Sequence, residues 1–443
     1  MFTAAEAERL IFTLVTPITA VETINMAAIA RTDAPTDAPT DMASLAMQSP
    51  DQYLGRVLAT AIRSPLDFPH WDNSAMDGYA LRASDVQTVP VSLEVIDAIA
   101  AGQQPQKTIK PGQAARILTG AMMPTGADTV VMQEETERQG NHVTILQAPQ
   151  PGDFVRQRGS FSQVGDVLLQ AGQVITPAEI ALLAAAQQTQ VQVYQRPRIA
   201  ILSTGSELVT PDQPMQPGQI VDSNQYALIA LVAQTGAIPV SLGIVKDDRA
   251  AVKGAIAAAL AASDMVISSG GVSVGDHDYI DDVLAELGAT LHIRAVAVKP
   301  GKPLTVASIA RATRKTLDAM PEDAAANTQL YFGLPGNPAS AMVSFWRFVA
   351  PAIAKLSRQA GPWSPTFVWA QATTALQAGG QRETYLWGKL TASESGYTFG
   401  QAPGSHSSGN LVNLANTNGL GIIPQGETQI AIGQPLKVLK TGT

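Results

Sequence analysis

Residues 198–356 alternate short apolar runs with longer amphipathic runs, and this alternation restricts the fold more than any other feature of the sequence. The apolar runs, which predict strands, are residues 199–202, 238–244 and 265–268. The amphipathic runs, which predict helices, are residues 224–235, 249–262 and 279–287, followed by a long helix from Asn337-Pro338 to about Leu356. Strands that alternate with helices form parallel sheets with helices on both faces. We therefore expect a doubly wound α/β domain.

The sequence on either side of this part has a different texture. Residues 4–15 and 52–63 repeat apolar side chains at helical spacing and predict two amphipathic helices. Residues 66–150 contain short alternating runs, among them 89–99 and 129–132, between Gly and Pro turns, which predicts a small β-rich domain. After Pro362, strands are expected at residues 366–370, 384–391, 396–399 and 429–438, which predict a small β-barrel or sandwich.

These textures predict a multidomain chain built from α/β and β parts. The expected domains are a discontinuous N-terminal α/β linker domain at residues 1–65 and 151–195, a small β-rich domain at 66–150, the doubly wound α/β domain at 196–360 and a C-terminal β-barrel at 361–443. The second piece of the linker domain carries a helix predicted for residues 177–188. Two insertions are expected: residues 31–51, whose repeated Thr-Asp-Ala-Pro predicts a flexible surface segment, and the Ala-rich residues 311–328.

Composition and charge exclude several classes of function. The formal net charge is −8, and an acidic chain does not seek a phosphate backbone, so no nucleic-acid partner is expected. The sequence has no cysteine, which excludes disulfides, thiolate metal sites and cysteine nucleophiles. The first residues are acidic where a signal peptide would be basic, and no apolar run approaches the roughly 20 residues of a membrane span. We therefore expect a cytoplasmic protein without a membrane segment.

A Ser/Gly loop between a predicted strand and a predicted helix is the clearest candidate site. It includes Ser269, Gly270, Gly271 and Ser273, and it ends near Asp278. Ligands bind at the carboxyl ends of strands in open parallel sheets, and glycines let backbone N–H groups converge on an anion. Asp276 and Asp278 would repel a bare phosphate but suit a divalent cation placed between them and a phosphate. The alternative is a helix-capping loop with solvated acids.

Two further strand ends carry carboxylates. Residues 203–208 join hydroxyls and a glycine to Glu207, although a turn with a capping serine would have the same composition. Asp247 and Asp248 follow the next predicted strand. These adjacent acids could hold Mg²⁺, or Asp248 could cap the next helix, and the capping interpretation is favoured.

Two later loops could bind anions. Lys299 and Lys302 stand in a Lys-Pro-Gly-Lys-Pro loop, where prolines hold the ammonium groups at a low cost in entropy. A tight turn at the start of the long helix has N–H groups that could face an anion, through Pro335, Gly336, Asn337 and Pro338. Both loops could instead be purely structural surface features.

Two loops rich in small polar residues lie in the β-rich part, and their residues alone do not indicate a chemical role. They are residues 72–80, which contain Asp77, and residues 119–128, which begin with Thr119. Periodicity predicts only turns at both places. The sequence also has no zinc-binding spacing, no Walker-type loop and no Gly-x-Ser-x-Gly elbow.

Taken together, these segments resemble the molybdopterin molybdenumtransferase family, known in bacteria as MoeA and in animals as the E domain of gephyrin. The matching segments are residues 72–80, 119–121, 203–208, 268–278, 299–303 and 333–340. Each is weak alone, but they occur in the family's order over roughly residues 50–440, and the ordered set is specific.

The resemblance implies an activity and an assembly. Members insert molybdate, as a substrate, into adenylyl-molybdopterin with Mg²⁺ as cofactor and release AMP to give molybdenum cofactor. It implies a homodimer whose active site is shared between protomers, so that Asp77 and Thr119 would act on the neighbouring chain's site. Other cofactor-synthesis proteins are further expected partners.

Site residues carried over by motif fall into three groups. The catalytic group is Asp77, Thr119, Glu207, Asp278, Lys299 and Lys302. The group that binds substrate and phosphate is Ser269, Gly270, Gly271, Ser273, Pro335, Gly336, Asn337, Pro338, Arg382, Ser405 and Ser407. The group expected to bind the metal is Glu207, Asp247, Asp248 and Asp278.

Two alternative functions stay open on the sequence. One is the related molybdopterin adenylyltransferase, whose fold resembles residues 198–357, but the additional domains argue against it. The other is a non-catalytic scaffold of the gephyrin E-domain type, which the acids and lysines at every site loop disfavour.

Overall fold

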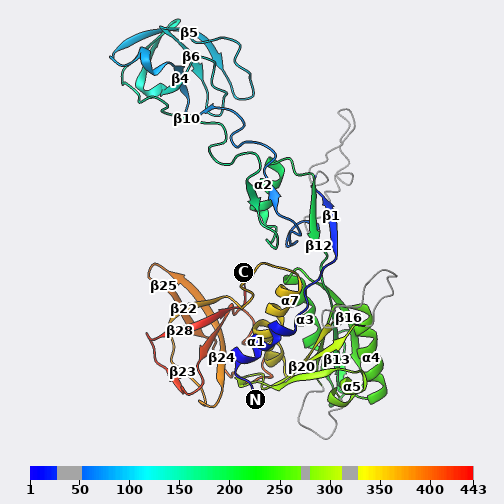
Figure 1. Cartoon of the computed structure of the whole chain (residues 1–443). Helices are drawn as coiled ribbons and strands as arrows, with labels where there is room; N and C mark the ends of the chain where they lie inside the picture. Colours follow the sequence, from blue (N-terminus) through cyan, green and yellow to red (C-terminus); the bar gives the residue numbers. More distant parts are fainter. Residues whose placement is uncertain (27–51, 271–279, 312–327, 443) are drawn as a thin grey trace, which may run out of the picture. The chain divides into compact units, whose positions relative to one another are not determined.

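The computed structural model describes residues 1–26, 52–270, 280–311 and 328–442, arranged as two compact units (Figure 1). The first unit comprises Met1–Ala59, Gly172–Thr176 and Gln190–Thr443, and the second comprises Thr60–Ala171 and Pro177–Thr189. This division is coarser than the four expected domains, whose boundaries stay a prediction. The expected insertion at residues 31–51, and all of 311–328 except its two end residues, lie outside the described residues.

A six-stranded sheet forms the centre of the first unit. Its strands, in spatial order, are β16 (Ile238–Val245), β13 (Arg198–Thr204), β17 (Met265–Ser269), β21 (Thr328–Leu334), β20 (Pro303–Ala310) and β18 (Thr290–Ala295). The first four strands are parallel, as predicted, whereas β20 runs antiparallel to both of its neighbours. The sheet is therefore parallel over its first four strands, and its β20 edge departs from the parallel arrangement. Only residues 296–302 connect β18 to β20, which is too short for the crossover that a parallel pair requires.

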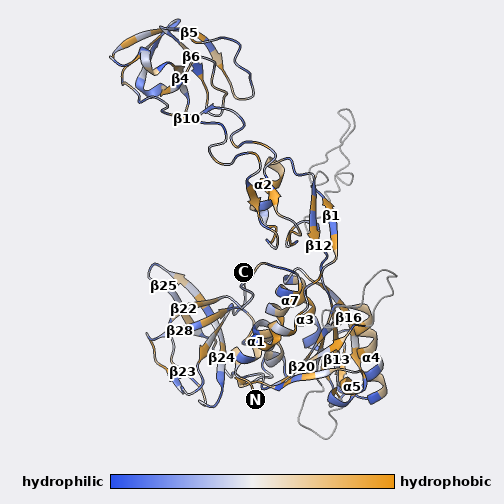
Figure 2. Cartoon of the chain, viewed as in Figure 1, coloured by the Kyte–Doolittle hydropathy of each residue, from blue (hydrophilic) through white to orange (hydrophobic). Residues whose placement is uncertain are grey.

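Helices cover both faces of this sheet, which confirms the doubly wound prediction. The helices are α3 (Ser223–Gln234), α4 (Arg249–Ala262), α5 (Ile280–Glu286) and a long helix made of α6 (Pro338–Ser344), the π-helical η7 (Phe345–Val349) and α7 (Ala350–Leu356). Consecutive residues of β13 enter different cores: Ile201 packs with α3 and the long helix, and Leu202 packs with α4 and α5. Figure 2 shows the hydrophobic residues along β13 and β20 that this double burial requires.

The N-terminal helix joins the same core. It is α1 (Ala4–Leu14), which confirms the helix expected at residues 4–15. Thr3 and Glu6 form a capping box at its start, and Ile11 is buried against the long helix. Glu8 of α1 pairs with the buried Arg347 of η7 at 2.9 Å, and a buried ion pair of this kind is costly to break.

A closed five-stranded barrel forms the end of the first unit. Its strands are β24 (Glu383–Ser393), β25 (Gly396–Gln401), β22 (Phe367–Ala372), β28 (Pro435–Lys440) and β26 (Gly419–Ile423), and closure comes from the β24–β26 pairing. The strand expected at residues 429–438 is divided into β27 (Gln429–Ile430) and β28, and β26 was not expected. Gly419 and Gly421 weaken the strand signal of β26, but their lack of side chains makes room for Val438 and Phe399.

The barrel is joined to the α/β part by hydrogen bonds and by a shared core. The short strand β19 (Val298–Lys299) leaves the α/β part and pairs with β24 in parallel. Tyr385 and Trp387 of β24 enter the same core as the long helix. The loop that carries the two expected lysines is therefore fixed between the two parts.

The helix expected at residues 52–63 is wrong. Val57 and Leu58 form isolated β-bridges with Val174 and Val193, and β2 (Ile62–Arg63) pairs with β11 (Val167–Leu169). Gly55 has a φ of +73°, which a helix does not allow. Tertiary pairing buries the apolar side chains that suggested a helix, and it overrides their local spacing.

In the first unit, β1 (Val21–Asn25) pairs antiparallel with β12 (Gln190–Tyr194).

The second unit is mainly β-structure, as expected for residues 66–150. Its six-stranded sheet has the order β7 (Thr129–Met132), β4 (Gly78–Leu81), β6 (Gln113–Ile117), β5 (Val91–Ile99), β9 (His142–Ile145) and β8 (Thr136–Gln139). The unit also contains β3 (Asn73–Ser74), which pairs with β10 (Val155–Arg156), and the helix α2 (Pro177–Ala185). The sheet separates two small apolar cores, so both of its faces are covered.

Gly421→Ala is expected to destabilise the barrel. A Cβ atom at this position would lie 2.5 Å from Cε1 of Phe399 and 3.0 Å from Cδ1 of Leu436. Forcing a methyl group into a packed core costs about 1–3 kcal/mol. The control is Gly254→Ala in α4, where no described atom lies within 4 Å of the added Cβ and helix propensity predicts a gain of about 1 kcal/mol. Thermal unfolding followed by circular dichroism should shift in opposite directions, and shifts of the same sign would contradict this packing.

Candidate functional site

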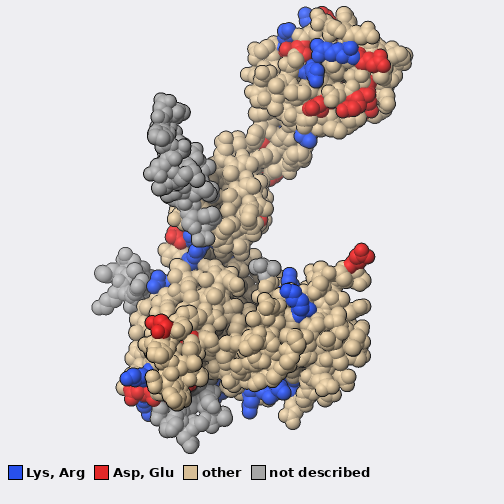
Figure 3. Space-filling view, turned by 180° about the vertical axis from the view of Figure 1, so that it is seen from behind, with Lys and Arg blue, Asp and Glu red and all other residues tan. Residues whose placement is uncertain are grey.

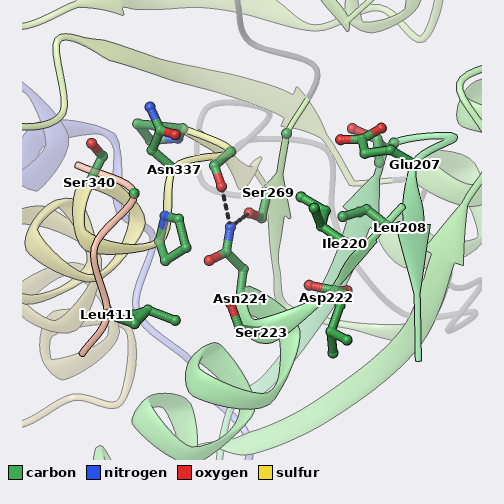
Figure 4. A pocket seen from close by; sticks show the side chains of 18 of the residues that line it. Glu207, Leu208, Ile220, Asp222, Ser223, Asn224, Ser269, Asn337, Ser340 and Leu411 are labelled. Carbon is green, nitrogen blue, oxygen red and sulfur yellow. Dashed lines mark hydrogen bonds between the residues drawn. The ribbon is translucent and has the colours of Figure 1, made fainter. Parts of the chain in front are cut away.

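The carboxyl ends of β13, β16, β17 and β21 border a cavity of about 680 Å³ (Figure 4). The strand order places the topological switch of the sheet between β13 and β17, and open α/β sheets bind ligands at such a point. The expected site residues that line this cavity are Glu207, Asp247, Ser269, Gly270, Pro335, Gly336, Asn337 and Pro338. The structure thus brings together four strand-end loops that are far apart in the sequence.

The end of β13 supplies a carboxylate and an apolar wall. Glu207 lines the cavity two residues after Gly205, whose missing side chain leaves room for the Glu207 carboxylate. The next residues form β14 (Leu208–Val209), which pairs with β15 (Ile220–Val221). Leu208 and Ile220 present apolar surface next to Glu207 (Figure 4).

The two adjacent acids after β16 have different environments. Asp247 lines the cavity, and its backbone N–H points to Ser206 Oγ at 3.4 Å. Asp248 is the N-cap of α4, and its carboxylate accepts a hydrogen bond of 2.9 Å from Ala251 N. The capping interpretation of Asp248 is confirmed, and a magnesium contact from Asp248 stays a prediction.

The turns after β17 and β21 pack directly against each other. Gly270 has a φ of +90°, and a Cβ there would lie 2.3 Å from the Thr204 carbonyl oxygen, so only glycine fits. Asn337 occupies the N-cap position of α6, and Pro338 follows it in the first turn, as predicted. The Asn337 side chain makes no capping bond within its helix, which leaves it available to the cavity. Gly271, Ser273 and Asp278 lie outside the described residues.

Several lining residues lie outside the segments that the sequence singled out. They are Asp222, Asn224 and Leu411. Asp222 could have been recognised as the N-cap of α3, because a capping acid before an apolar helix is a local signal. Asn224 has no such signal, because its role depends on two loops that follow it by 45 and 112 residues.

The lysine loop lies beside the cavity. Lys299 and Lys302 are exposed and do not line it, but Pro303 does. Gly301, with a φ of +105°, packs where a Cβ would meet Ser344 Oγ of α6 at 2.9 Å. Arg382 donates a hydrogen bond of 3.2 Å to the Val298 carbonyl oxygen, so this expected cation lies at the same junction of β19 and β24.

The expected serines lie on a barrel loop that touches α6. Ser405 and Ser407 are exposed, and the Ser405 carbonyl oxygen accepts bonds of 2.8 Å from Asn410 and Asn413. Ser408 O accepts a 3.0 Å bond from Ala339 N in the first turn of α6. Gly409 and Leu411 of this loop line the cavity. The loop therefore brings barrel residues to the cavity, although the two expected serines are not in its lining.

Asp77 and Thr119 form a hydrogen-bonded pair in the second unit. Asp77 accepts bonds from the backbone N–H of Thr119 at 2.6 Å and from its hydroxyl at 2.7 Å. The backbone donor, followed by the hydroxyl, lowers the pKa of the exposed Asp77 carboxyl below its ordinary value. The pair is thus held together with Asp77 ionised, and its action on a neighbouring chain stays a prediction.

Comparison with known proteins agrees with this geometry. Residues 5–186 match the family model described as the MoeA N-terminal region, domains I and II, and residues 370–441 match the MoeA C-terminal region, domain IV. Residues 200–355 match a probable molybdopterin binding domain. A relative from Nostoc, named molybdopterin molybdenumtransferase, is 56% identical over 390 residues that span 87% of this chain and 86% of the relative. The chain belongs to the MoeA family.

Other members of the MoeA family are more distant but cover as much of the chain. A Haemophilus influenzae relative of the same name is 34% identical and covers 86% of this chain and 90% of itself. The crystal structure of a molybdopterin biosynthesis MoeA protein from Pyrococcus horikoshii OT3 is 25% identical, with a TM-score of 0.77 over 99% of this chain and 100% of that one. The family resemblance inferred from the ordered motifs is therefore confirmed.

Among the described residues on the face shown in Figure 3, Lys and Arg are scattered over a mostly uncharged surface and form no continuous basic area. Within the described part of the chain, no helix is both long and apolar enough to cross a bilayer.

The cavity carboxylates fit a magnesium ion that is shared with phosphate. Glu207 and Asp247 both line the cavity, and they supply the hard oxygen ligands that Mg²⁺ prefers. Mg²⁺ usually takes only one or two protein carboxylates and completes its shell with phosphate and water. The described residues contain no cluster of three or more His, Asp or Glu side chains arranged for a metal.

Thr119→Val is expected to raise the pKa of Asp77 toward its ordinary value of 3.8 without reaching it. The variant loses the hydroxyl donor but keeps the backbone donor, which lowers the pKa more. An NMR titration of the side-chain carboxyl groups measures this directly. Thr136→Val is the control, because its hydroxyl donates to the Gln133 carbonyl oxygen and to no carboxylate. A pKa that does not move would mean that the hydroxyl bond is not made in solution.

Proposed function

We propose that this chain inserts molybdate into adenylyl-molybdopterin and releases AMP, which yields the molybdenum cofactor. One observation carries the proposal: carboxylates and anion-binding turns from four strand ends converge on one cavity. Residues 200–355, which match a probable molybdopterin binding domain, include every part of the cavity lining except Gly409 and Leu411. The relatives named molybdopterin molybdenumtransferase support the same reaction.

The two ends of the cavity suit the two ends of such a substrate. Ser269, Gly270 and the turn at Gly336 offer donors and close backbone approach to phosphate oxygens. Glu207 and Asp247 would hold Mg²⁺, which, when bound, would polarise the phosphate and stabilise the charge that develops on AMP as it leaves. The apolar surface of Leu208 and Ile220 would cover a flat ring and exclude water from the bond that is cleaved.

Molybdate would approach from the junction with the barrel. It is a tetrahedral dianion, and it needs cations together with hydroxyl or N–H donors. Lys299, Lys302 and Arg382 lie at the junction of β19 and β24, and the loop with Ser405 and Ser407 lies against the first turn of α6. We assign these five side chains to molybdate and to the terminal phosphate of the pterin.

The proposed enzyme is a cytoplasmic homodimer in which each active site is shared between the two protomers. Asp77 and Thr119 of one protomer would act on the cavity of the other. Their support is chemical: the ionised Asp77 is exposed on its own unit and is held in place by two hydrogen bonds. Dimer formation, the location and the contact between protomers are all parts of the proposal.

AMP release tests the reaction. Purified protein supplied with adenylyl-molybdopterin, Mg²⁺ and molybdate should release AMP, and no release would overturn the proposal. Asp247→Asn is expected to lower the Mg²⁺-dependent rate by about 100-fold, an effect typical of losing one electrostatic contact to the reacting group. Asp248→Asn is the matched comparison, because Asn caps a helix as well as Asp does. A larger loss from Asp248→Asn would move the metal contact to that residue, and AMP formation from ATP would favour the adenylyltransferase alternative.

Mixing two inactive variants tests the shared site. Asp77→Asn and Glu207→Gln are each expected to be inactive as homodimers. If each site uses Glu207 of one chain and Asp77 of the other, a heterodimer contains one intact site, and random re-association of equal amounts recovers about a quarter of wild-type activity. No recovery after verified subunit exchange would place both residues in the site of one chain.

A further inference from the structure

Asn224 connects two of the loops that form the cavity. It lies in the first turn of α3, it is only 8% exposed, and it lines the cavity. Its Nδ2 donates to Ser269 Oγ at 2.6 Å and to the Gly336 carbonyl oxygen at 2.8 Å (Figure 4). One side chain thus holds the turn after β17 against the turn after β21.

The two bonds fix which group donates and which accepts in each contact of Asn224. A carbonyl oxygen only accepts, so the Gly336 bond requires that the amide nitrogen, and not the amide oxygen, faces the loops. An amide nitrogen only donates, so Ser269 Oγ must be the acceptor in the second bond. The hydroxyl hydrogen of Ser269 therefore cannot point at Asn224.

The Ser269 hydroxyl hydrogen has no other acceptor among the described residues. Ser269 is 2% exposed and lines the cavity, so its free hydrogen is in a largely dry position. A buried donor without an acceptor is costly, and an anionic oxygen would remove this cost with a short, charge-assisted bond. The arrangement favours a ligand oxygen that only accepts.

We propose that Asn224 is a positioning residue that makes Ser269 a donor to a phosphate oxygen of the substrate. This inference rests on the proposed function, because it assigns a ligand to the same cavity. Gly336 orients the amide of Asn224, Asn224 orients the hydroxyl of Ser269, and Ser269 then selects an anion over a neutral group. The preference is built in before the ligand arrives, so no hydroxyl has to reorient upon binding.

Asn224→Asp reverses this polarity with almost no change of shape. A carboxylate at this position would accept the Ser269 hydrogen and would face the Gly336 carbonyl oxygen without a donor. A purely structural role predicts that Asn224→Asp is milder than Asn224→Ala, because it keeps the volume. The polarity role predicts the opposite order for an anionic ligand, and no effect of either variant on a neutral one.

The experiment measures the binding of AMP and of adenosine, each with Mg²⁺, by calorimetry. Asn224→Ala is expected to weaken AMP binding by about threefold and Asn224→Asp by about thirtyfold, which corresponds to one or two lost hydrogen bonds. Adenosine binding should change less than twofold in both variants. Asn418→Ala is the control: it removes a side-chain amide that bonds only the Leu390 backbone in the barrel and does not line the cavity, and it should leave AMP binding unchanged.

Repeating the comparison with Ser269→Ala separates polarity from simple charge repulsion. If Asn224 acts through Ser269, the tenfold gap between Asn224→Asp and Asn224→Ala should shrink to about threefold or less, because contacting residues are not additive. A gap that stays the same overturns the proposal.

If Asn224→Asp does not fold, the loss of AMP binding caused by Asn224→Ala must itself vanish in the Ser269→Ala background. A loss that persists in that background overturns the proposal. Wild-type protein that releases AMP yet shows an unchanged gap refutes this inference alone, whereas wild-type protein that neither binds nor releases AMP refutes the proposed function as well.

Discussion

The common direction of four strands is the constraint on which the rest of the first unit depends. Because β13, β16, β17 and β21 are parallel, their carboxyl ends meet at one edge of the sheet, and each end continues into a loop with polar residues. β13, β17 and β21 are buried on both faces, so their order and register are fixed by packing that lies away from the site. A rigid sheet can therefore hold short polar loops against one another without help from a ligand.

The barrel belongs to the same compact unit as the α/β part. β19 leaves the α/β part and joins β24, and Trp387 of β24 packs in the core that contains the long helix. The buried Arg347 links Glu8 of α1 to Tyr385 of β24, where its Nε lies 3.0 Å from the tyrosine hydroxyl. These contacts hold the lysine loop and the serine loop beside α6, so cations from one part can serve an anion bound in the other.

Patterns that repeat within one element were predicted well. The bounds of α4 and β7 match the sequence prediction, and Asn337-Pro338 marks the start of the long helix. Errors occurred where a distant contact decides the local structure. Residues 52–63 have helical spacing but pair as strands, and β26 was missed because its glycines make room for Phe399. Asn224 was missed for the same reason, since nothing near it in the sequence shows the two turns that it joins.

The sequence by itself determined the doubly wound α/β class, the family and most of the loops that face the cavity. Those properties depend on periodicity and on residue types within short segments, which a chain carries before it folds. The tertiary structure alone decided that Asp247 faces the cavity while Asp248 caps a helix, and that Asn224 sets the hydrogen-bond direction of Ser269. Such choices depend on distances between residues that are far apart along the chain, and only the packed sheet brings these residues together.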